Sequence, residues 1–336
     1  MNEPLVSIVM PVYNADRFLV EALASMQAQT FKDWELICVN DGCTDDSGRI
    51  LNWFASIEPR MRLINQNNRG LVGALNRGVE AVHGSLIARM DADDIAVPDR
   101  FEKQVAFLRE HPLHVAVGGS ILQMDVDSDP LSLESLPGDH EVIEERLLTR
   151  RTGMFHPTVM MRSADVFAVG AYRVEYEWVE DHDLWLRLAQ RGRLANLPDL
   201  LLAYRLHSTS VCWSKSDGQR RKVNDVLREA YRVRNRELPG SVILESNVSR
   251  SKAGHGKWAR AAAKGGLVHS ALKHLKAMQT ENVSNLYKLR MTTEVLLRLL
   301  MAAPRSLVQR VPQVPRFPDA VEAYQSHIAA TAKQCA

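Results

Sequence analysis

The feature that most constrains the fold is the alternation of short apolar runs with amphipathic helix patterns over residues 5 to 125. Val6 to Val12 is a nearly continuous apolar run of strand length, and the apolar residues after Asn14 recur at helical spacing. Further strand-length runs lie at Trp34 to Val39, Met61 to Ile64 and Ser85 to Met90. Buried runs that alternate with amphipathic helices predict an α/β fold with a mostly parallel central sheet and helices on both faces, a Rossmann-like arrangement.

The pattern becomes less regular after residue 125. Asp125 to Pro137 is rich in Ser, Pro and Asp and predicts a loop. The later predicted elements are a helix over Asp139 to Arg150, a strand over Thr158 to Met161, a helix over Asp183 to Arg191, and strands over Leu194 to Leu197 and Leu201 to Leu206. After Ser214 the sequence is mainly helical and rich in arginine. We therefore expect a catalytic part over residues 1 to 214 and a helical, basic part over residues 215 to 336.

Polar side chains follow the predicted strands at the point where each strand ends. In an open α/β sheet, ligands bind beyond the carboxyl ends of the strands. The residues at these ends are Tyr13, Asn14, Asn40, Asp41, Asn67, Asn68, Asp91, Asp93 and Asp94. The chemistry is therefore expected at this edge of the sheet.

The strongest local signal is the acidic string Asp91-Ala92-Asp93-Asp94, directly after a mostly apolar run. Three carboxylates within four residues repel one another unless a cation neutralises them, and hard oxygen ligands suit Mg²⁺ or Mn²⁺. The alternative is a solvated acidic turn that caps the following helix. We expect a divalent cation at this turn.

Two further clusters carry titratable groups. Glu180-Asp181-His182-Asp183 precedes an apolar helix pattern, where acidic residues favour the helix N-terminus by themselves. Crowded carboxylates also raise one another's pKa, which suits one of them to act as a general base. Tyr204-Arg205-Leu206-His207 ends an apolar run, so His207 could bind metal or phosphate and Arg205 could pair with phosphate, although a lone histidine is more often structural.

Charge is distributed unevenly along the chain. Residues 1 to 214 contain 20 Lys and Arg against 31 Asp and Glu, and residues 215 to 336 contain 22 against 9. The acidic part argues against nucleic acid as the main ligand. The basic part predicts an anionic partner such as a membrane surface. The apolar residues Val295, Leu296, Leu299 and Leu300, at helical spacing among arginines, resemble an interfacial helix but would equally fit packing on the catalytic part.

The four cysteines show neither disulfide nor metal-ligand spacing, which predicts free thiols in a reducing compartment. The first residues show no leader pattern, and the most apolar stretch, Val295 to Ala303, is too short to span a bilayer. We expect a cytoplasmic protein that is soluble or peripheral on the inner face of the cell membrane.

Several motifs of the sequence occur in a fixed order over residues 5 to 211. They are Val6 to Asn14, Val39 to Asp45, Asn68 to Gly70, Ala74 to Gly78, Met90 to Ile95, Pro98 to Arg100, His156 to Thr158, Glu180 to Arg187 and Tyr204 to His207. This set resembles the family 2 glycosyltransferases of the A-type nucleotide-sugar-binding fold. Cys43 stands where that family usually has Ser, and Leu75 where many members have Arg. Residues 215 to 336 carry no part of the resemblance.

The resemblance implies a role for individual residues. Those implied to bind the nucleotide are Pro11, Tyr13, Asp41, Asn68, Asn76 and Asp91. Asp91 and Asp93 look like the metal-binding D-x-D pair for Mn²⁺ or Mg²⁺, with His207 as a further metal or phosphate contact, and Asp181 looks like the catalytic base. Residues implied to lie near the acceptor or to support the site are His156, Glu180, Asp183, Trp185, Arg187 and Arg205.

The implied function is inverting transfer of a sugar from a nucleotide-diphosphate donor, most often a UDP-sugar, to a hydroxyl of a glycan or lipid-linked acceptor, as in the synthesis of polysaccharides, glycolipids or cell-surface glycans. A nucleotide-sugar-forming nucleotidyltransferase would need a Gly- and Arg/Lys-rich loop after the first strand, but Val12 to Phe18 holds no glycine and only Arg17. A D-x-D-x-T phosphatase would have Thr in place of Ile95. A non-catalytic nucleotide-sugar-binding scaffold stays an alternative, which the intact Asp181 disfavours.

Overall fold

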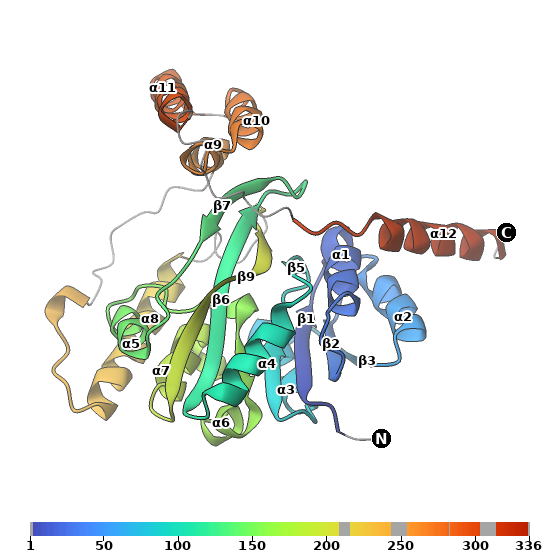
Figure 1. The fold of residues 1–336 in the computed structure, drawn as a ribbon, viewed down its shortest axis with the longest axis vertical. Helices are drawn as coiled ribbons and strands as arrows, with labels where there is room; N and C mark the ends of the chain where they lie inside the picture. Colours follow the sequence, from blue (N-terminus) through green and yellow to red (C-terminus); the bar gives the residue numbers. More distant parts are fainter. Residues whose placement is uncertain (1–2, 208–215, 243–253, 282, 303–313, 335–336) are drawn as a thin grey trace.

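The structure is a computed structural model that describes residues 3–207, 216–242, 254–281, 283–302 and 314–334 (Figure 1). Its first half is a parallel sheet in the order β3-β2-β1-β4. The strands are β1 (Val6–Val12), β2 (Trp34–Asp41), β3 (Met61–Gln66) and β4 (Leu86–Arg89). The helices between and after them are α1 (Asp16–Gln27), α2 (Ser47–Ile57), α3 (Gly70–Val79) and α4 (Arg100–Glu110). The predicted α/β alternation is confirmed, with element ends within a few residues of those expected.

The two faces of this sheet receive different helices because successive strand residues point to opposite sides. Ile8 and Met10 of β1 pack with α1, α2 and α4 in one core. Val9, between them in sequence, packs with Val72 and Leu75 of α3 on the other face. All five side chains are at most 1% exposed, so the continuous apolar run of β1 reflects burial on both faces.

Beyond β4 the sheet is mixed, in the order β8-β6-β9-β5, with β7 paired to β6. These strands are β5 (Ile95–Ala96), β6 (His114–Met124), β7 (Pro130–Glu134), β8 (Met160–Arg162) and β9 (Arg193–Arg205). β6 and β9 run parallel, whereas β8 is antiparallel to both β4 and β6. The short strand β5 is antiparallel to β9. The sheet thus keeps its parallel character where β1 to β4 lie and curls beyond them.

Two predictions differ from the structure in the number or kind of elements, whereas the strand predicted from Thr158 differs only in its bounds, Met160–Arg162. The strands expected at Leu194 to Leu197 and Leu201 to Leu206 are one strand, β9, which skips pairing to β6 at Pro198 and Asp199. Proline lacks an N–H for the ladder, so the sequence pattern was interrupted although the strand continues. The predicted loop Asp125 to Pro137 contains β7, whose Leu131 is fully buried against the C-terminal helices.

A second core lies under the helices that follow β7. These are α5 (His140–Leu148), α6 (Ser163–Ala168), α7 (Glu180–Leu188) and α8 (Ser216–Val233), with the short helices η1 (His156–Thr158), η2 (Val174–Tyr176) and η4 (Gly240–Val242). Helix α7 begins three residues before its predicted start at Asp183. Leu227 and Tyr231 of α8 pack in the same core as Leu184 of α7 and Ile143 of α5. Helix α8 therefore packs with α5 and α7 rather than with the more distant C-terminal helices.

The remaining helices are α9 (His255–Lys264), α10 (Val268–Met278), α11 (Asn285–Ala302) and α12 (Pro318–Gln334). Figure 1 shows α9, α10 and α11 together beyond the end of β7, and α12 beside α1. The first three helices form their own small core, which includes Ala263, Ala271, Val295 and Leu131 of β7. Tyr324 of α12 lies against Trp53 of α2, with ring centroids 5.3 Å apart. We call residues 254–302 the helical unit.

Candidate active site

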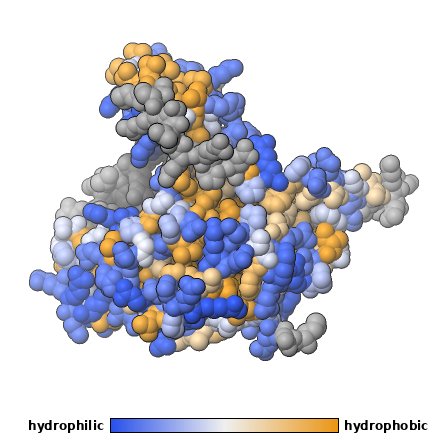
Figure 2. Space-filling model, viewed as in Figure 1, coloured by the Kyte–Doolittle hydropathy of each residue, from blue (hydrophilic) through white to orange (hydrophobic). Residues whose placement is uncertain are grey.

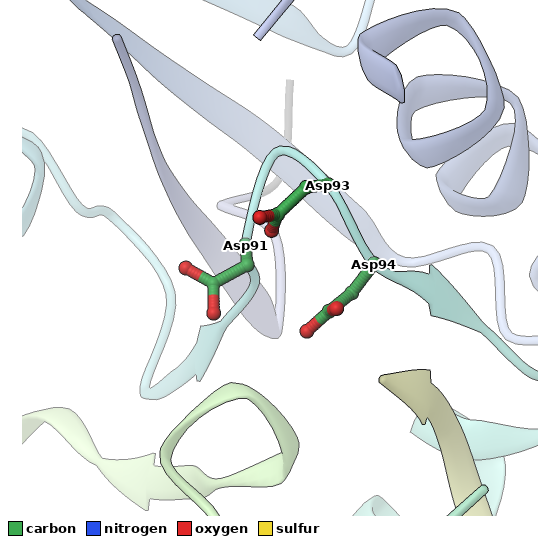
Figure 3. Close-up of side chains that lie close together, drawn as sticks. All are labelled: Asp91, Asp93 and Asp94. Atoms are coloured by element: carbon green, nitrogen blue, oxygen red, sulfur yellow. The ribbon is translucent and has the colours of Figure 1, made fainter. Parts of the chain in front are cut away.

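The acidic turn predicted at the end of β4 brings three carboxylates together. One oxygen each from Asp91, Asp93 and Asp94 lies within 4.8 Å of the other two, and Figure 3 shows the three side chains gathered at one turn of the chain. Antiparallel pairing of Ile95 with Ala203 joins this turn to the end of β9. The same register, continued for two residues, places Asp93 beside Arg205. The sheet topology thus fixes where the acidic turn lies.

The carboxylates are crowded as well as close. Asp94 is 1% exposed, and burial together with Asp93 and Asp91 raises its pKa well above the usual value. Burial also raises the pKa of Asp91, although Arg89 opposes the shift. Oδ2 of Asp94 has no hydrogen-bond partner among the described residues. Three crowded carboxylates, one of which keeps an oxygen without a donor among the described residues, offer the hard oxygen ligands that Mg²⁺ or Mn²⁺ prefers, so these residues fit a divalent cation.

Arg205 holds the acidic turn in place. Its backbone N–H donates to Oδ1 of Asp94 at 2.8 Å, and its Nε donates to the carbonyl oxygen of Asp93 at 2.9 Å. Its two terminal nitrogens donate to Ser128 Oγ and Glu21 Oε2, both at 2.9 Å. The side chain is 1% exposed. Arg205 therefore fixes the acidic turn, and its guanidinium donates its hydrogen bonds to other protein groups.

His207 lies at the same edge, two residues further along. Its Nε2 is 2.7 Å from Oδ2 of Asp93, and its ring lies 5.3 Å from that of Phe18. The predicted proximity of His207 to the D-x-D pair is thus present in the structure. An imidazole in this position can orient the Asp93 carboxylate or share its ligand.

Arg89 is a site residue that the sequence analysis did not single out. It is 4% exposed and forms an ion pair with Asp91. Its charge also acts on Glu180, Tyr172 and His156, which come from other segments of the chain. The sequence feature that could have identified Arg89 is that it is the one charged residue within the apolar run before Asp91. Arg89 thus brings a positive charge that pairs with the acidic turn and also acts on the second acidic cluster.

The second cluster lies at the start of α7. Glu180 is 5% exposed, and burial together with the charge of Asp181 raises its pKa to about 7. Asp181 is partly exposed, and its Oδ1 accepts the N–H of His182 at 2.7 Å. Asp183 is 1% exposed and pairs with both Arg173 and Arg187. Of the three carboxylates, Asp181 is the one that is partly exposed and not paired with an arginine in the described contacts.

The other residues predicted near the acceptor form the wall behind this cluster. Trp185 is 1% exposed, and its ring meets that of His156 edge-on at 5.7 Å between centroids. Nε2 of His156 lies 2.9 Å from the Tyr172 hydroxyl, and burial lowers the His156 pKa well below its usual value. Arg187 donates to the carbonyl oxygens of Val169 and Ala171 at 2.6 and 2.8 Å. These side chains hold the cluster rigidly.

The residues predicted to bind the nucleotide are spread along the ends of β1, β2 and α3. Tyr13 is 52% exposed beyond β1, and Asp41 is 3% exposed at the end of β2. Oδ1 of Asp41 accepts from Gln66 Nε2 at 2.7 Å and from the Arg69 N–H at 2.8 Å. Asn68 is exposed, and its Oδ1 accepts the N–H of Gly70. Pro11 is buried within β1 next to Val39 of β2.

Asn76 makes a reciprocal pair with the backbone of Tyr172. Its Nδ2 donates to the Tyr172 carbonyl at 2.8 Å, and its Oδ1 accepts the Tyr172 N–H at 3.0 Å. These two bonds join α3 to the segment before α7. The amide of Asn76 is thereby engaged with the protein itself, so it positions the wall of the site.

Cys43 and its neighbours close the loop after β2. The Asn14 N–H donates to Cys43 Sγ at 3.4 Å, and Asn14 Oδ1 accepts the Thr44 N–H at 2.9 Å. Asn14 has a φ of 49°, a left-handed conformation that asparagine tolerates better than most residues. Cys38 and Cys43 are free thiols, as predicted, and Cys212 and Cys335 lie outside the described residues.

Comparison with known proteins supports the resemblance seen in the motifs. A family model described as glycosyl transferase family 2 matches residues 7–170. An uncharacterized glycosyltransferase of Haemophilus influenzae is 31% identical over 240 residues, which are 68% of this chain and 73% of the relative. The putative glycosyltransferase EpsE of Bacillus subtilis is 37% identical over 60% of this chain and 73% of its own. The amylovoran biosynthesis glycosyltransferase AmsE of Erwinia amylovora is 33% identical over 61% of this chain and 77% of its own.

Solved structures share the fold at low sequence identity. Residues 1–349 of S. aureus TarS in complex with UDP-GlcNAc align with a TM-score of 0.54 at 14% identity, over 88% of this chain and 81% of that one. The mannosyltransferase PcManGT of Pyrobaculum calidifontis, in complex with GDP-Man and Mn²⁺, aligns with a TM-score of 0.52 at 16% identity, over 91% and 88% of the two chains. The chain spans 49% of a longer TarS structure.

The raised pKa of Glu180 predicts a pH dependence of stability. Because its folded-state pKa is about 7 against a usual 4.5, protonated Glu180 stabilises the fold fully below pH 4.5 and loses this contribution as pH rises to about 7. The shift corresponds to about 3 kcal/mol. We expect the free energy of unfolding of wild type, measured in urea at a series of pH values, to fall relative to that of Glu180→Gln as the pH rises from below 4.5 to above 7. A difference in unfolding free energy between the two proteins that stays constant over this pH range would contradict the raised pKa of Glu180.

Proposed function

Because the chain belongs to glycosyltransferase family 2, we propose that it is an inverting glycosyltransferase that moves a sugar from a nucleoside-diphosphate donor to an acceptor hydroxyl. The observation that carries this proposal is that two acidic clusters, one at the end of β4 and one at the start of α7, lie close enough for Arg89 to pair with the first and to act electrostatically on the second. The first suits a diphosphate with its cation, and the second suits an acceptor that loses a proton. A single displacement between them inverts the anomeric configuration.

Asp91 and Asp93 are proposed to hold the divalent cation, Mn²⁺ or Mg²⁺, together with His207. When bound, the cation neutralises the negative charge that develops on the departing diphosphate. The oxygens of all three aspartates lie within reach of one ion. The Mn²⁺ in the PcManGT structure supports a cation in this family fold.

Asp181 is proposed as the general base. It would accept the proton of the acceptor hydroxyl while the hydroxyl oxygen bonds to the anomeric carbon and the bond from that carbon to the diphosphate oxygen breaks. Glu180 is almost fully buried, and Asp183 is neutralised by two arginines. Asp181 is thus the carboxylate of this cluster that is partly exposed, so that an acceptor can reach it, and that pairs with no arginine among the described contacts. The rigid wall formed with Trp185 keeps it in position.

The nucleotide is proposed to lie over the ends of β1 and β2. The exposed ring of Tyr13 can stack on the base, and Asp41 can accept hydrogen bonds from the base or the ribose. A UDP-sugar is the proposed donor, supported by the UDP-GlcNAc in the TarS structure. GDP-Man in the PcManGT structure makes a guanosine donor the main alternative.

The proposed acceptor is a glycan or lipid-linked glycan in the synthesis of a polysaccharide or another cell-surface glycan, supported by the amylovoran biosynthesis named for AmsE. We also propose that the catalytic unit includes α8, which shares its core, so that the functional division falls after residue 242 rather than after residue 214. A nucleotidyltransferase would release pyrophosphate, and a binding scaffold would show no donor turnover. Product analysis distinguishes both from a transferase.

An anionic membrane surface is the proposed partner of the helical unit. None of the described helices has the length and apolarity needed to cross a bilayer. Val295 and Leu299 of α11 pack inward, whereas other leucines of α11 are exposed, and Figure 2 shows the apolar surface that they form. The exposed residues are Leu286 at 76%, Leu289 at 66%, Leu296 at 44%, Leu297 at 53% and Leu300 at 71%.

Charge supports a lipid surface as the occupant of this face. The described residues of the helical unit include eight Lys and Arg against two acidic residues, Glu281 and Glu294. Each basic residue near an anionic surface contributes up to about 1 kcal/mol. Leucines on one face of a basic helical unit are typical of interfacial attachment. Attachment here would place the enzyme at the inner face of the cell membrane, where lipid-linked acceptors lie.

The metal proposal predicts that Asp93→Asn loses Mn²⁺-dependent binding of UDP and transfer activity. The fold should persist with an unchanged or higher melting temperature, because the change relieves repulsion and keeps the shape of the side chain. Titration calorimetry with UDP, with and without Mn²⁺, measures the loss, and a screen of UDP-, GDP- and dTDP-sugars identifies the donor. Asp33→Asn, an exposed carboxylate at the opposite edge of the sheet, is the matched control. Full transfer activity of wild type in excess chelator would contradict the proposal that a divalent cation is required.

The base assignment predicts that Asp181→Asn leaves donor binding intact while turnover falls at least about 100-fold, as expected for a lost general base. Asparagine is nearly isosteric, so the wall of the site should not move. Transfer rates and donor affinities of Asp181→Asn and Glu180→Gln are to be compared. If Glu180→Gln were inactive and Asp181→Asn active, the base would be Glu180.

The membrane proposal predicts that wild type sediments with anionic vesicles at low salt and is released at high salt. Leu289→Ser with Leu297→Ser should lower binding at least about tenfold, since each exposed leucine contributes about 1.5 kcal/mol or more when buried in the interface. Leu113→Ser, a 73% exposed leucine of the catalytic part, should not change binding. Equal sedimentation of wild type with anionic and neutral vesicles would contradict the proposal.

A further inference from the structure

The turn between β6 and β7 is closed onto α10 by one lysine. Nζ of Lys273 lies 2.6 Å from Asp125 Oδ2, 2.9 Å from Asp127 Oδ2 and 2.6 Å from Asp129 Oδ2. Nε2 of His274 lies 3.0 Å from the same Asp125 oxygen. The ammonium group thus occupies the centre of three carboxylates that come from a single turn. A charge carried by the helical unit thus offsets part of the negative charge of this turn, to which Arg17 also contributes through Asp127 at 3.8 Å.

This turn is tightly built around Asp125, which is fully buried. Oδ1 of Asp125 accepts the N–H groups of Asp127 and Asp129, both at 2.9 Å. Burial alone would raise the pKa of Asp125, but His274 and Lys273 hold it below its usual value. The carboxylate is therefore ionised, and its charge depends on the two residues of α10.

The same turn reaches the metal-binding loop through Arg205. One terminal nitrogen of Arg205 donates to Ser128 Oγ at 2.9 Å, inside the Asp125–Asp129 turn. The opposite side of the residue donates to the Asp93 carbonyl and to Asp94 Oδ1, as described above. The next residue, Leu206, packs in the core of the helical unit. Every link from Lys273 to Asp93 is a direct contact.

We propose that the helical unit is a positioning element of the catalytic site, in which Lys273 sets the Asp125–Asp129 turn and the turn sets Arg205 and the Asp91–Asp94 loop. This inference rests on the proposed role of that loop in holding a cation. Lys273 touches neither donor nor acceptor and is a positioning residue. Without its charge the three carboxylates repel one another, Ser128 moves and Arg205 loses one of its anchors. Ligands of a metal ion must be held to within about 0.5 Å, so a small shift of Arg205 lowers affinity.

The experiment compares Lys273→Met with Lys276→Met in the full chain. Methionine keeps an unbranched side chain that ends where the Cε of lysine lies, and it removes the ammonium group with its charge. Lys276 is an exposed lysine on the same helix. Two quantities are measured: the affinity for Mn²⁺ alone, by electron paramagnetic resonance, and hydrogen exchange of the Arg205 amide, which donates to Asp94. Lys273→Met should weaken Mn²⁺ binding about 10- to 100-fold, as for residues that orient metal ligands. It should also speed exchange at Arg205, whereas Lys276→Met should change neither.

Ser128→Ala tests the contact between the Asp125–Asp129 turn and Arg205 without changing any residue of the helical unit. It removes the Oγ that Arg205 donates to and should weaken Mn²⁺ binding in the same direction. Because both changes act through Arg205, Lys273→Met with Ser128→Ala should lose less than the sum of the single losses. This variant keeps the inference testable if Lys273→Met does not fold.

Two results overturn the inference. In the first, Lys273→Met binds Mn²⁺ as wild type does while exchange in α10 rises, so that the lysine only attaches the helical unit. In the second, the Lys273→Met and Ser128→Ala losses are fully additive. Failure of the cation proposal itself looks different: wild type would then bind Mn²⁺ no more tightly than Asp93→Asn. The Arg205 exchange measurement, which needs no metal, still decides whether Lys273 acts on the loop.

Discussion

Repulsion among Asp91, Asp93 and Asp94 is the constraint on which the site depends. Three carboxylates at one turn are unfavourable unless positive charge surrounds them, and two arginines supply it from within the protein. Arg89 forms an ion pair with Asp91, and Arg205 donates hydrogen bonds to the Asp93 carbonyl oxygen and to Asp94. These arginines hold the turn in shape, but one oxygen of Asp94 has no donor within the part of the chain that the structure describes. This assembled cluster is the basis of our proposal that the turn binds a cation together with a diphosphate.

The catalytic geometry follows from topology. Parallel strands β1 to β4 bring the residues proposed to bind the nucleotide and the acidic turn to one edge, and the antiparallel pairing of β5 with β9 brings Arg205 and His207 to the same place. Helix α7 then presents Asp181 beside Glu180, and Arg89 connects the two clusters electrostatically. The proposed roles, with one cluster at the leaving group and the other accepting the proton, thus follow from which elements lie at the sheet edge.

Much of this arrangement could be predicted from the sequence. Asp91 and Asp93 stood out because carboxylates directly after an apolar run mark a strand end, and the strands themselves were recognisable from continuous burial. Long-range contacts could not be predicted. The sequence does not show that Lys273 meets Asp125 across 148 residues, or that α8 shares a core with α7. The family resemblance named Asp181 as the base, but the residue pattern alone did not distinguish it from Asp183, and the structure shows the physical difference: Asp183 is buried and paired with two arginines.

Crystals of the enzyme grown with UDP and Mn²⁺, with diffraction measured at the manganese absorption edge, test the central claim most directly. The account predicts one anomalous peak in contact with the Asp91 and Asp93 carboxylates and with the diphosphate, and the base above Tyr13. A bound diphosphate with no peak at this turn, or a peak at another cluster while Asp91 remains paired only with Arg89, would contradict it.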